Sequence, residues 1–264
     1  MREPNRPVAL TIAGSDSGGE AGIQADLKTF ALLQVHGASA ITCATAQNRQ
    51  TVTRMEPCSP ALVRAQIEAA ASSLPLAAAK TGMLYSAAIV TAVAAFFQQA
   101  PSLPLVVDPV MVSSSGRRLL QAGGLRALRR ALLPLAALVT PNVPEAEILL
   151  GRRIATVEDL RAAARDIFQR FGCATLAKGG HLPGSGEAVD FLYSSRGEWL
   201  LTTPRIRGGG RHGTGCTYSA AITAWLARGC PLEKAVERAK NHLTRSIYES
   251  REGPTEACDL RSSV

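Results

Sequence analysis

Short apolar runs alternate with longer amphipathic stretches along most of the chain. The first apolar run, residues 8–13, leads through a glycine-rich turn into residues 22–35. There Ile23, Leu27 and Phe30 recur at helical spacing and share one face. Alternating strand-like and helix-like segments are typical of a parallel sheet covered by helices. The pattern therefore predicts an α/β fold with a mainly parallel central sheet and helices on both faces.

The remaining segments continue this alternation to the end of the chain. Further strands are predicted at 38–44, 77–80, 105–108, 138–140, 174–177, 191–194 and 199–203, and helices at 59–73, 86–99, 119–132, 156–171, 214–228 and 231–250. Ser59 and Thr156 are capping residues for two of these helices. No internal repeat or flexible linker divides the chain. We therefore expect one domain over residues 8–250, a flexible N-terminus at 1–7 and a loosely ordered tail at 251–264.

Composition excludes several classes of protein. In 264 residues, 46% are hydrophobic and 19% charged, without the roughly 20-residue apolar run that a membrane-spanning helix needs. The N-terminus has no apolar signal region, so the expected location is the cytoplasm. The six cysteines are scattered singly, without the C-x-x-C spacing of a zinc site, and the chain is too long to depend on disulfides.

The net charge of +8 comes mainly from arginine, since only five of the 29 basic residues are lysine. The arginines occur singly or in pairs, and aromatic residues make up 5% of the chain. A nucleic-acid-binding protein usually gathers its cations into a stripe with interleaved aromatics. The charge therefore favours a solvated basic surface or attraction of a small anionic substrate, and we expect no nucleic-acid or membrane partner.

Polar residues follow several predicted strands, where the ligand sites of open parallel sheets gather. Residues 14–19, GSDSGG, follow the first strand, and their glycines allow a ligand to approach the backbone closely, although a tight structural turn needs the same residues. They match neither a Rossmann nor a P-loop motif. Gln47 follows the second strand, and its amide could bind the edge of a neutral heterocycle or simply be solvated in a loop.

Carboxylates follow two further strands. Asp108 ends a buried apolar run, where a carboxylate costs desolvation unless it binds something. Asn142 and Glu145 lie three residues apart at a helix start. Together these side chains could hold Mg²⁺ through water and phosphate. The alternative for Asn142 and Glu145 is a helix cap with a capping box.

The strongest motif is GGGRHGTGCT at 208–217, which runs directly into an apolar helix. Flexible glycines before a helix direct backbone N–H groups and the positive end of the helix dipole to one point, which favours anion binding. Cys216 would lie in the first helical turn, where we expect its thiol pKa to fall, although it could also be a small buried residue. Lys178 ends another strand and could reach a phosphate.

Together these motifs resemble the ribokinase-like superfamily, and within it the hydroxymethylpyrimidine/phosphomethylpyrimidine kinases of thiamine biosynthesis. The resemblance runs from about Val8 to Tyr248 and is carried by AGSDSGG followed by AGIQADLKTF at 21–30, TAQN at 45–48, KTGML at 80–84, VVDPVMV at 106–112, TPN-x-PEA at 140–146, KGGH at 178–181 and HGTGCT at 212–217. Seven motifs in family order are far more specific than any one of them.

The resemblance implies ATP and Mg²⁺ as cofactors, and phosphorylation of an aminopyrimidine and of its monophosphate. It also implies roles for individual residues. Gln47, Gly14, Asp26, Met83 and Val110 would bind the pyrimidine. Lys178 and Asn142 would bind the nucleotide, and Asp108 and Glu145 would organise Mg²⁺. The catalytic residues would be Gly213, Thr214, Gly215 and Cys216, whose N–H groups stabilise the transferring phosphoryl group. A homodimer is the superfamily-based expectation.

This chain departs from the family pattern at three places. Glu20 stands where the family has glycine or alanine, and it could complement the dipole of the first helix. Ser114 replaces the usual lysine, and residues 207–211 read RGGGR. We hypothesise that Arg117 or Arg211 replaces the missing lysine charge near the phosphates. Two alternative functions stay open, a pyridoxal kinase on the same scaffold and a catalytically impaired pyrimidine-binding homologue.

Overall fold

The computed structural model describes residues 6–113, 116–180, 182, 186–206 and 213–252. The predicted terminal segments 1–7 and 251–264 lie largely outside these ranges, as do Ser114, Arg211 and the rest of residues 207–212. Within the described part, no helix is both long enough and apolar enough to cross a membrane.

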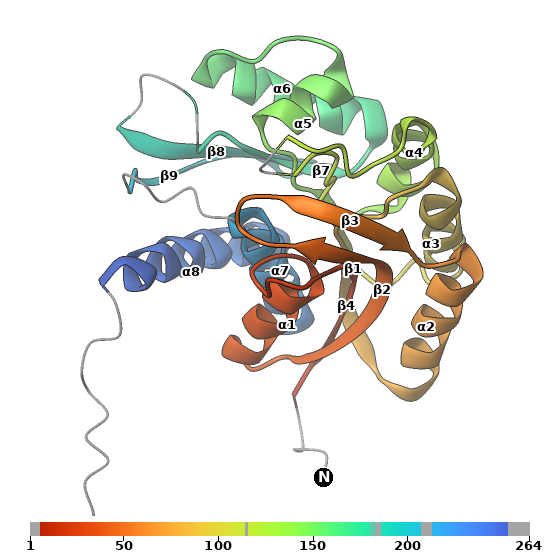
Figure 1. Ribbon diagram of the computed structural model, residues 1–264. Coiled ribbons are helices and arrows are strands. Elements are labelled where there is room, and N and C mark those ends of the chain that lie inside the picture. The colour runs from red at the N-terminus through yellow and green to blue at the C-terminus, as the bar shows by residue number, and fades with distance from the viewer. Residues whose placement is uncertain (1–5, 114–115, 181, 183–185, 207–212, 253–264) are drawn as a thin grey trace, which may run out of the picture.

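One nine-stranded sheet forms the centre of the molecule (Figure 1), in the order β3-β2-β1-β4-β5-β6-β7-β8-β9. The strands are β1 (Val8–Asp16), β2 (His36–Gln47), β3 (Val52–Pro57), β4 (Leu76–Thr81), β5 (Leu105–Val107), β6 (Leu138–Val139), β7 (Ala174–Lys178), β8 (Glu187–Ser194) and β9 (Gly197–Pro204). The six strands from β2 to β7 pair in parallel, and β3, β8 and β9 pair antiparallel at the two edges. The predicted, mainly parallel sheet is confirmed.

Helices cover both faces of the sheet (Figure 1). They are α1 (Gly22–Leu32), α2 (Pro60–Ser73), α3 (Ala87–Gln99), α4 (Ala122–Ala127), α5 (Val143–Leu150), α6 (Val157–Phe171), α7 (Thr214–Ala227) and α8 (Leu232–Glu252). After α4 the chain continues through a π-helical turn, Leu128–Leu132, so the predicted helix at 119–132 is shorter and irregular. Ser59 and Thr156 cap α2 and α6 as predicted, each accepting a hydrogen bond from a backbone N–H.

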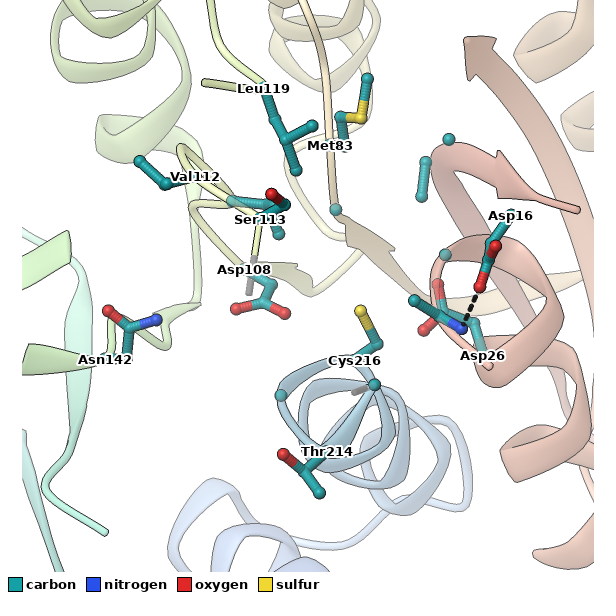
Figure 2. A pocket seen from close by; sticks show the side chains of 18 of the residues that line it. Asp16, Asp26, Met83, Asp108, Val112, Ser113, Leu119, Asn142, Thr214 and Cys216 are labelled. Atoms are coloured by element: carbon teal, nitrogen blue, oxygen red, sulfur yellow. Dashed lines mark hydrogen bonds between the residues drawn. The ribbon is translucent and has the colours of Figure 1, made fainter. Parts of the chain in front are cut away.

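The two faces bury separate cores because successive side chains of a strand point to opposite sides. Leu10 and Ile12 of β1 pack toward α2, α3 and α6, whereas Ala9, the residue before Leu10, packs toward α1, α7 and α8. All three side chains are fully buried. The sheet thus holds the carboxyl ends of its parallel strands at one edge, and the N-terminus of α7 lies against that edge (Figure 2).

Two elements were not predicted. Strand β3 is a polar edge strand in which only Val52 is buried, so it lacks a hydrophobic pattern. Helix α5 has eight residues, and its start was interpreted mainly as a metal site. Predicted strands were also too short at their ends, because β1 and β2 continue in extended conformation through polar residues to Asp16 and Gln47.

Candidate active site

A cavity of about 550 Å³ opens at the carboxyl ends of the parallel strands. Its walls come from the loop after β1, the ends of β2, β4 and β7, the segment after β5 and the N-termini of α5 and α7. Of the predicted site residues that the structure describes, all but Arg117 line it: Gly14, Asp26, Gln47, Met83, Asp108, Val110, Asn142, Glu145, Lys178, Gly213, Thr214, Gly215 and Cys216. Figure 2 shows several of these side chains pointing into the cavity.

One end of the cavity has apolar walls and the amide of Gln47. Met83 packs with Cys43 and Leu119 in a small cluster. A Cβ built on Gly14 would lie 3.4 Å from the sulfur of Met83, so glycine keeps the space between strand and thioether open. Gln47 lies at the end of β2, and its backbone is held by Ser17, whose Oγ donates to Gln47 O and accepts from Gln47 N, both at 2.9 Å. This end suits a flat heterocycle with polar atoms on one edge.

The loop between β1 and α1 is organised by the Asp16 carboxylate. Its oxygens accept hydrogen bonds from the backbone N–H groups of Gly18, Glu20 and Ala21 at 2.8, 3.0 and 2.8 Å. A Cβ built on Gly22 would lie 2.2 Å from the Gly14 carbonyl oxygen, so that position accepts only glycine. The loop is thereby fixed beside Gln47.

The other end of the cavity is charged. The Asp108 carboxylate is 3% exposed and accepts hydrogen bonds from Lys178 Nζ at 3.1 Å, Thr140 Oγ1 at 3.2 Å and Ser219 Oγ at 3.1 Å. Burial lowers the pKa of Lys178, but the negative charges of Asp108 and Glu145 outweigh this effect and raise it, so the ammonium stays charged. A Cβ built on Gly215 would lie 3.6 Å from Lys178 Nζ, which places this cation beside the start of α7.

Asn142 and Glu145 form the capping box of α5. Asn142 Oδ1 accepts from the Glu145 N–H and Glu145 Oε2 accepts from the Asn142 N–H, both at 2.9 Å. The helix-cap alternative therefore holds, and both residues still line the cavity. Burial raises the pKa of Glu145 to about 7, although Lys178 lowers it. Its carboxyl group thus changes charge near neutral pH.

Helix α7 begins at the cavity with Gly213 in the left-handed conformation, at φ +87°. A Cβ there would lie 1.9 Å from the backbone oxygen of Glu20, so only glycine lets the start of α7 approach the loop after β1. A helix leaves its first N–H groups without partners inside the helix. The positive end of the α7 dipole therefore faces the cavity and favours an anion there.

The predicted fall in the Cys216 pKa is wrong. The thiol points into the cavity from the first turn of α7 (Figure 2). Burial raises its pKa to about 11, and the nearby Lys80 cation only partly offsets this effect. Desolvation of the thiolate outweighs the helix dipole, so Cys216 is a protonated thiol at neutral pH.

A buried ion pair was missed by sequence reasoning. Lys80 Nζ lies 2.7 Å from Asp26 Oδ1, and neither side chain is exposed to solvent. Asp26 Oδ2 also accepts from Thr11 Oγ1 at 2.6 Å. Burial raises the pKa of Asp26 more than Lys80 and Thr11 lower it. The KTGML motif contained Lys80, but its partner is 54 residues away in the chain.

The departures from the family pattern have different outcomes. Arg117 donates to the carbonyl oxygen of Val52 and does not line the cavity, so the structure does not bring it to the other predicted nucleotide-binding residues. Arg211 lies outside the described residues. Glu20 precedes Ala21, the N-cap of α1, and so lies outside the first helical turn. Its carboxylate instead accepts from Arg49 Nε, at 2.7 and 2.9 Å to its two oxygens.

The cavity offers two carboxylates to a cation. Among the residues that the structure describes, no three His, Cys, Asp or Glu side chains form a metal cluster. Asp108 and Glu145 line one wall, and the charge of Asp108 adds to burial in raising the pKa of Glu145. Mg²⁺ needs only one or two carboxylates when water and phosphate oxygens complete its shell. The donor set therefore fits Mg²⁺ brought by a nucleotide.

A second cavity of about 970 Å³ adjoins the first and shares Asn142, Pro144, Lys178, Thr214 and Gly215 with it. Its walls include the apolar side chains of Pro204, Ile206, Leu243 and Ile247. Lys240 and Asp190 also line this cavity, with Lys240 Nζ 2.6 Å from Asp190 Oδ2. The two cavities together form a path from the amide at Gln47, past Lys178, to an apolar cleft.

Comparison with known proteins agrees with this geometry. The family model described as phosphomethylpyrimidine kinase matches residues 16–256. A hydroxymethylpyrimidine/phosphomethylpyrimidine kinase of Synechococcus elongatus is 47% identical over 245 residues, 92% of each chain. The thiamine biosynthesis bifunctional protein ThiED of Geobacter sulfurreducens is 46% identical, and the match covers 92% of this chain but 49% of that longer protein.

Solved structures are similar as well. The phosphomethylpyrimidine kinase of Clostridium difficile superposes with a TM-score of 0.81 at 40% identity, covering 92% of this chain and all of that one. The pyridoxal kinase of Staphylococcus aureus, in complex with AMP-PCP and pyridoxal, superposes with a TM-score of 0.83 at 35% identity, covering 92% and 88%. The ribokinase-like fold expected from the sequence is therefore confirmed.

Proposed function

The chain belongs to the phosphomethylpyrimidine kinase family, and we propose that it transfers the terminal phosphoryl group of ATP first to 4-amino-5-hydroxymethyl-2-methylpyrimidine and then to its monophosphate. It is a kinase of thiamine biosynthesis, like its curated relatives. The observation that carries the substrate assignment is one cavity with an amide and apolar walls at one end and Asp108, Lys178 and the start of α7 at the other.

In this proposal the pyrimidine lies between Gly14 and Met83, and Gln47 binds its amino and ring-nitrogen edge. An amide can donate and accept at once, which matches that edge. Asp26 and Val110 complete the pocket. The hydroxymethyl group then faces the charged end of the cavity, where transfer takes place.

The nucleotide occupies the second cavity, with its base on the apolar walls and its phosphates at Lys178 and Asn142. Asp108 and Glu145 would hold Mg²⁺, which neutralises phosphate charge when bound. The N–H groups of residues 213–216 bind the oxygens of the transferring phosphoryl group. Cys216 contributes as a hydrogen-bonding thiol, because its raised pKa leaves it protonated at neutral pH.

Pyridoxal kinase activity is the second candidate, favoured by the structural similarity to the enzyme of Staphylococcus aureus. Both substrates are methylated nitrogen heterocycles with a hydroxymethyl group, so the pocket walls separate them poorly. A catalytically impaired homologue that keeps the pocket is the third. It is motivated by Ser114 in place of the usual lysine.

Transfer of labelled phosphate from ATP to the pyrimidine, its monophosphate and pyridoxal distinguishes these functions. We expect turnover of the first two substrates. Turnover of pyridoxal alone would replace the first proposal with the second, and no turnover of any substrate would favour the third. The homodimer and the cytoplasmic location stay predictions, and size-exclusion chromatography with light scattering tests the first of them.

A further inference from the structure

Lys80 is a buried cation in the substrate cavity to which the proposed reaction has so far given no role. It is the next-to-last residue of β4, its side chain is completely buried, and it lines the cavity beside Asp26. Asp26 comes from α1 and is itself held by Thr11 of β1. Three elements thus fix the position of one ammonium group.

The ammonium group has more donors than the protein uses. Lys80 Nζ carries three N–H donors. Among the described residues, Asp26 Oδ1 is its one hydrogen-bond partner. A buried donor without an acceptor is costly. Because the side chain borders the cavity, a ligand oxygen can accept from it there.

The charged groups around Lys80 indicate that it lies at the end of the cavity that binds the pyrimidine, the substrate that accepts the phosphoryl group. The charged or titratable groups that face it are Asp26 of α1, Cys216 of α7 and Asp108 after β5. Burial lowers the pKa of Lys80, but the nearby carboxylates, Asp26 above all, outweigh that effect and raise it, so Lys80 is positively charged. Lys178, in contrast, contacts Asp108 and lies beside Gly215. One cation therefore serves the phosphate end and the other lies next to the pyrimidine pocket.

We propose that Lys80 is a catalytic residue that donates a hydrogen bond to the hydroxymethyl oxygen of the pyrimidine and stabilises the negative charge of that oxygen during transfer. The hydroxymethyl oxygen bonds to the γ-phosphorus. The bond from phosphorus to the β,γ-bridging oxygen breaks, and its electron pair leaves with ADP. The hydroxyl proton passes to an oxygen of the transferred phosphoryl group, since the Cys216 thiol is already protonated. The role of Asp26 is to keep the buried Lys80 charged.

This inference rests on the proposed function, and a neutral replacement of the pair tests it. In Lys80→Met with Asp26→Asn, neither charge is left buried without a partner, so the variant should fold. We expect kcat for the pyrimidine to fall about 10²- to 10³-fold, the usual loss for one donor to a developing charge. The KM for ATP should stay within about twofold of the wild type, because Lys80 does not line the second cavity.

The matched control is Lys240→Met with Asp190→Asn, which removes a buried lysine–aspartate pair of similar length from the second cavity. We expect this control to change the KM for ATP more than kcat. Circular dichroism and thermal unfolding of both variants establish that they are folded. A folded Lys80→Met/Asp26→Asn enzyme with kcat within about threefold of the wild type would overturn the proposal.

Asp26→Asn alone gives a second readout that does not depend on the double variant. Without Asp26, burial lowers the pKa of Lys80, so the catalytic cation should be lost as pH rises. We expect kcat of this variant to decline with rising pH relative to that of the wild type. A pH profile parallel to that of the wild type contradicts the role of Lys80. If the wild type phosphorylates none of the three substrates, the proposed function itself fails, which is a different result.

Discussion

Two buried lysine–aspartate pairs lie in the two cavities, and their surroundings differ more than their geometry. Lys80 and Asp26 are 2.7 Å apart and fully buried, and Lys240 and Asp190 are 2.6 Å apart and 7% and 3% exposed. Lys240 also donates to the Ala188 carbonyl oxygen at 3.1 Å. Asp190 in turn accepts a hydrogen bond from the Gly179 N–H, so both members of the Lys240 pair contact the backbone.

The Lys240–Asp190 pair links α8 to β8, because both side chains also form hydrogen bonds with the protein backbone. The Lys80 pair satisfies its aspartate through Thr11 but leaves its lysine with one partner in the described part of the chain. The same two residue types can therefore stabilise the fold in one cavity and present a donor to a ligand in the other. What separates the two roles is the number of acceptors around the ammonium group.

The largest effect is expected from breaking the structural pair on one side. Lys240→Met leaves Asp190 buried without its counter-charge, which should lower the free energy of unfolding by about 3 to 5 kcal/mol. Adding Asp190→Asn should recover most of this loss, because no uncompensated charge remains. Urea denaturation of the two variants measures the difference. Equal loss in both would mean that packing, not charge, makes the pair important.

An intermediate effect is expected from Glu145, a buried carboxylate without a direct lysine hydrogen bond. Its folded pKa, about 7, is above the ordinary value of 4.5, so the folded protein favours the protonated form. This contribution to stability is complete below pH 4.5 and is lost as pH rises to about 7. Glu145→Gln keeps an acceptor for the capping box but cannot ionise.

Without nucleotide or Mg²⁺, the unfolding free energy of the wild type should therefore fall relative to Glu145→Gln between pH 5 and pH 8. The expected change is on the order of 2 kcal/mol. Glu158→Gln, an exposed carboxylate in the first turn of α6, is the control. A constant difference between wild type and Glu145→Gln across this range would show that Glu145 is charged throughout.

The smallest effect is expected from an exposed pair of the same opposite charges. Glu20 and Arg49 form a bidentate contact, but the Arg49 side chain is 73% exposed. Solvent and salt screen such pairs, which contribute about 0.2 to 1 kcal/mol. A double-mutant cycle with Glu20→Ala and Arg49→Ala should give a coupling energy in this range that decreases in 0.5 M salt, roughly three times the physiological ionic strength. A coupling as large as that of the Lys240 pair would show that burial does not decide the ranking.

Local sequence signals predicted most of the fold. Apolar runs and capping residues such as Ser59 identified the strands of the central sheet and the long helices. The edge strand β3 was not predicted, because only one of its side chains is buried. Periodicity depends on burial, so an edge strand with a solvated face gives little of it.

The site was predicted by motifs in family order, and its described residues, apart from Arg117, line one cavity. The motifs could not predict polar and electrostatic interactions between residues that are far apart in the sequence. The Lys80–Asp26 pair and the contact of Arg117 with Val52 join residues 54 and 65 positions apart. The Cys216 error has the same origin, because a helix terminus is visible in the sequence but desolvation by the surrounding elements is not.

The contact between Gly213 and the Glu20 carbonyl has a consequence for the order of assembly on the ribosome. The two residues are about 190 positions apart in the chain, yet they are in close contact in the fold, where Gly213 lines the cavity. At a synthesis rate of about 5 to 20 residues per second, the β1 loop waits roughly 10 to 40 seconds for its partner. During that time the nascent chain has the β1 loop but not the start of α7, so the cavity is complete only after α7 has left the ribosome.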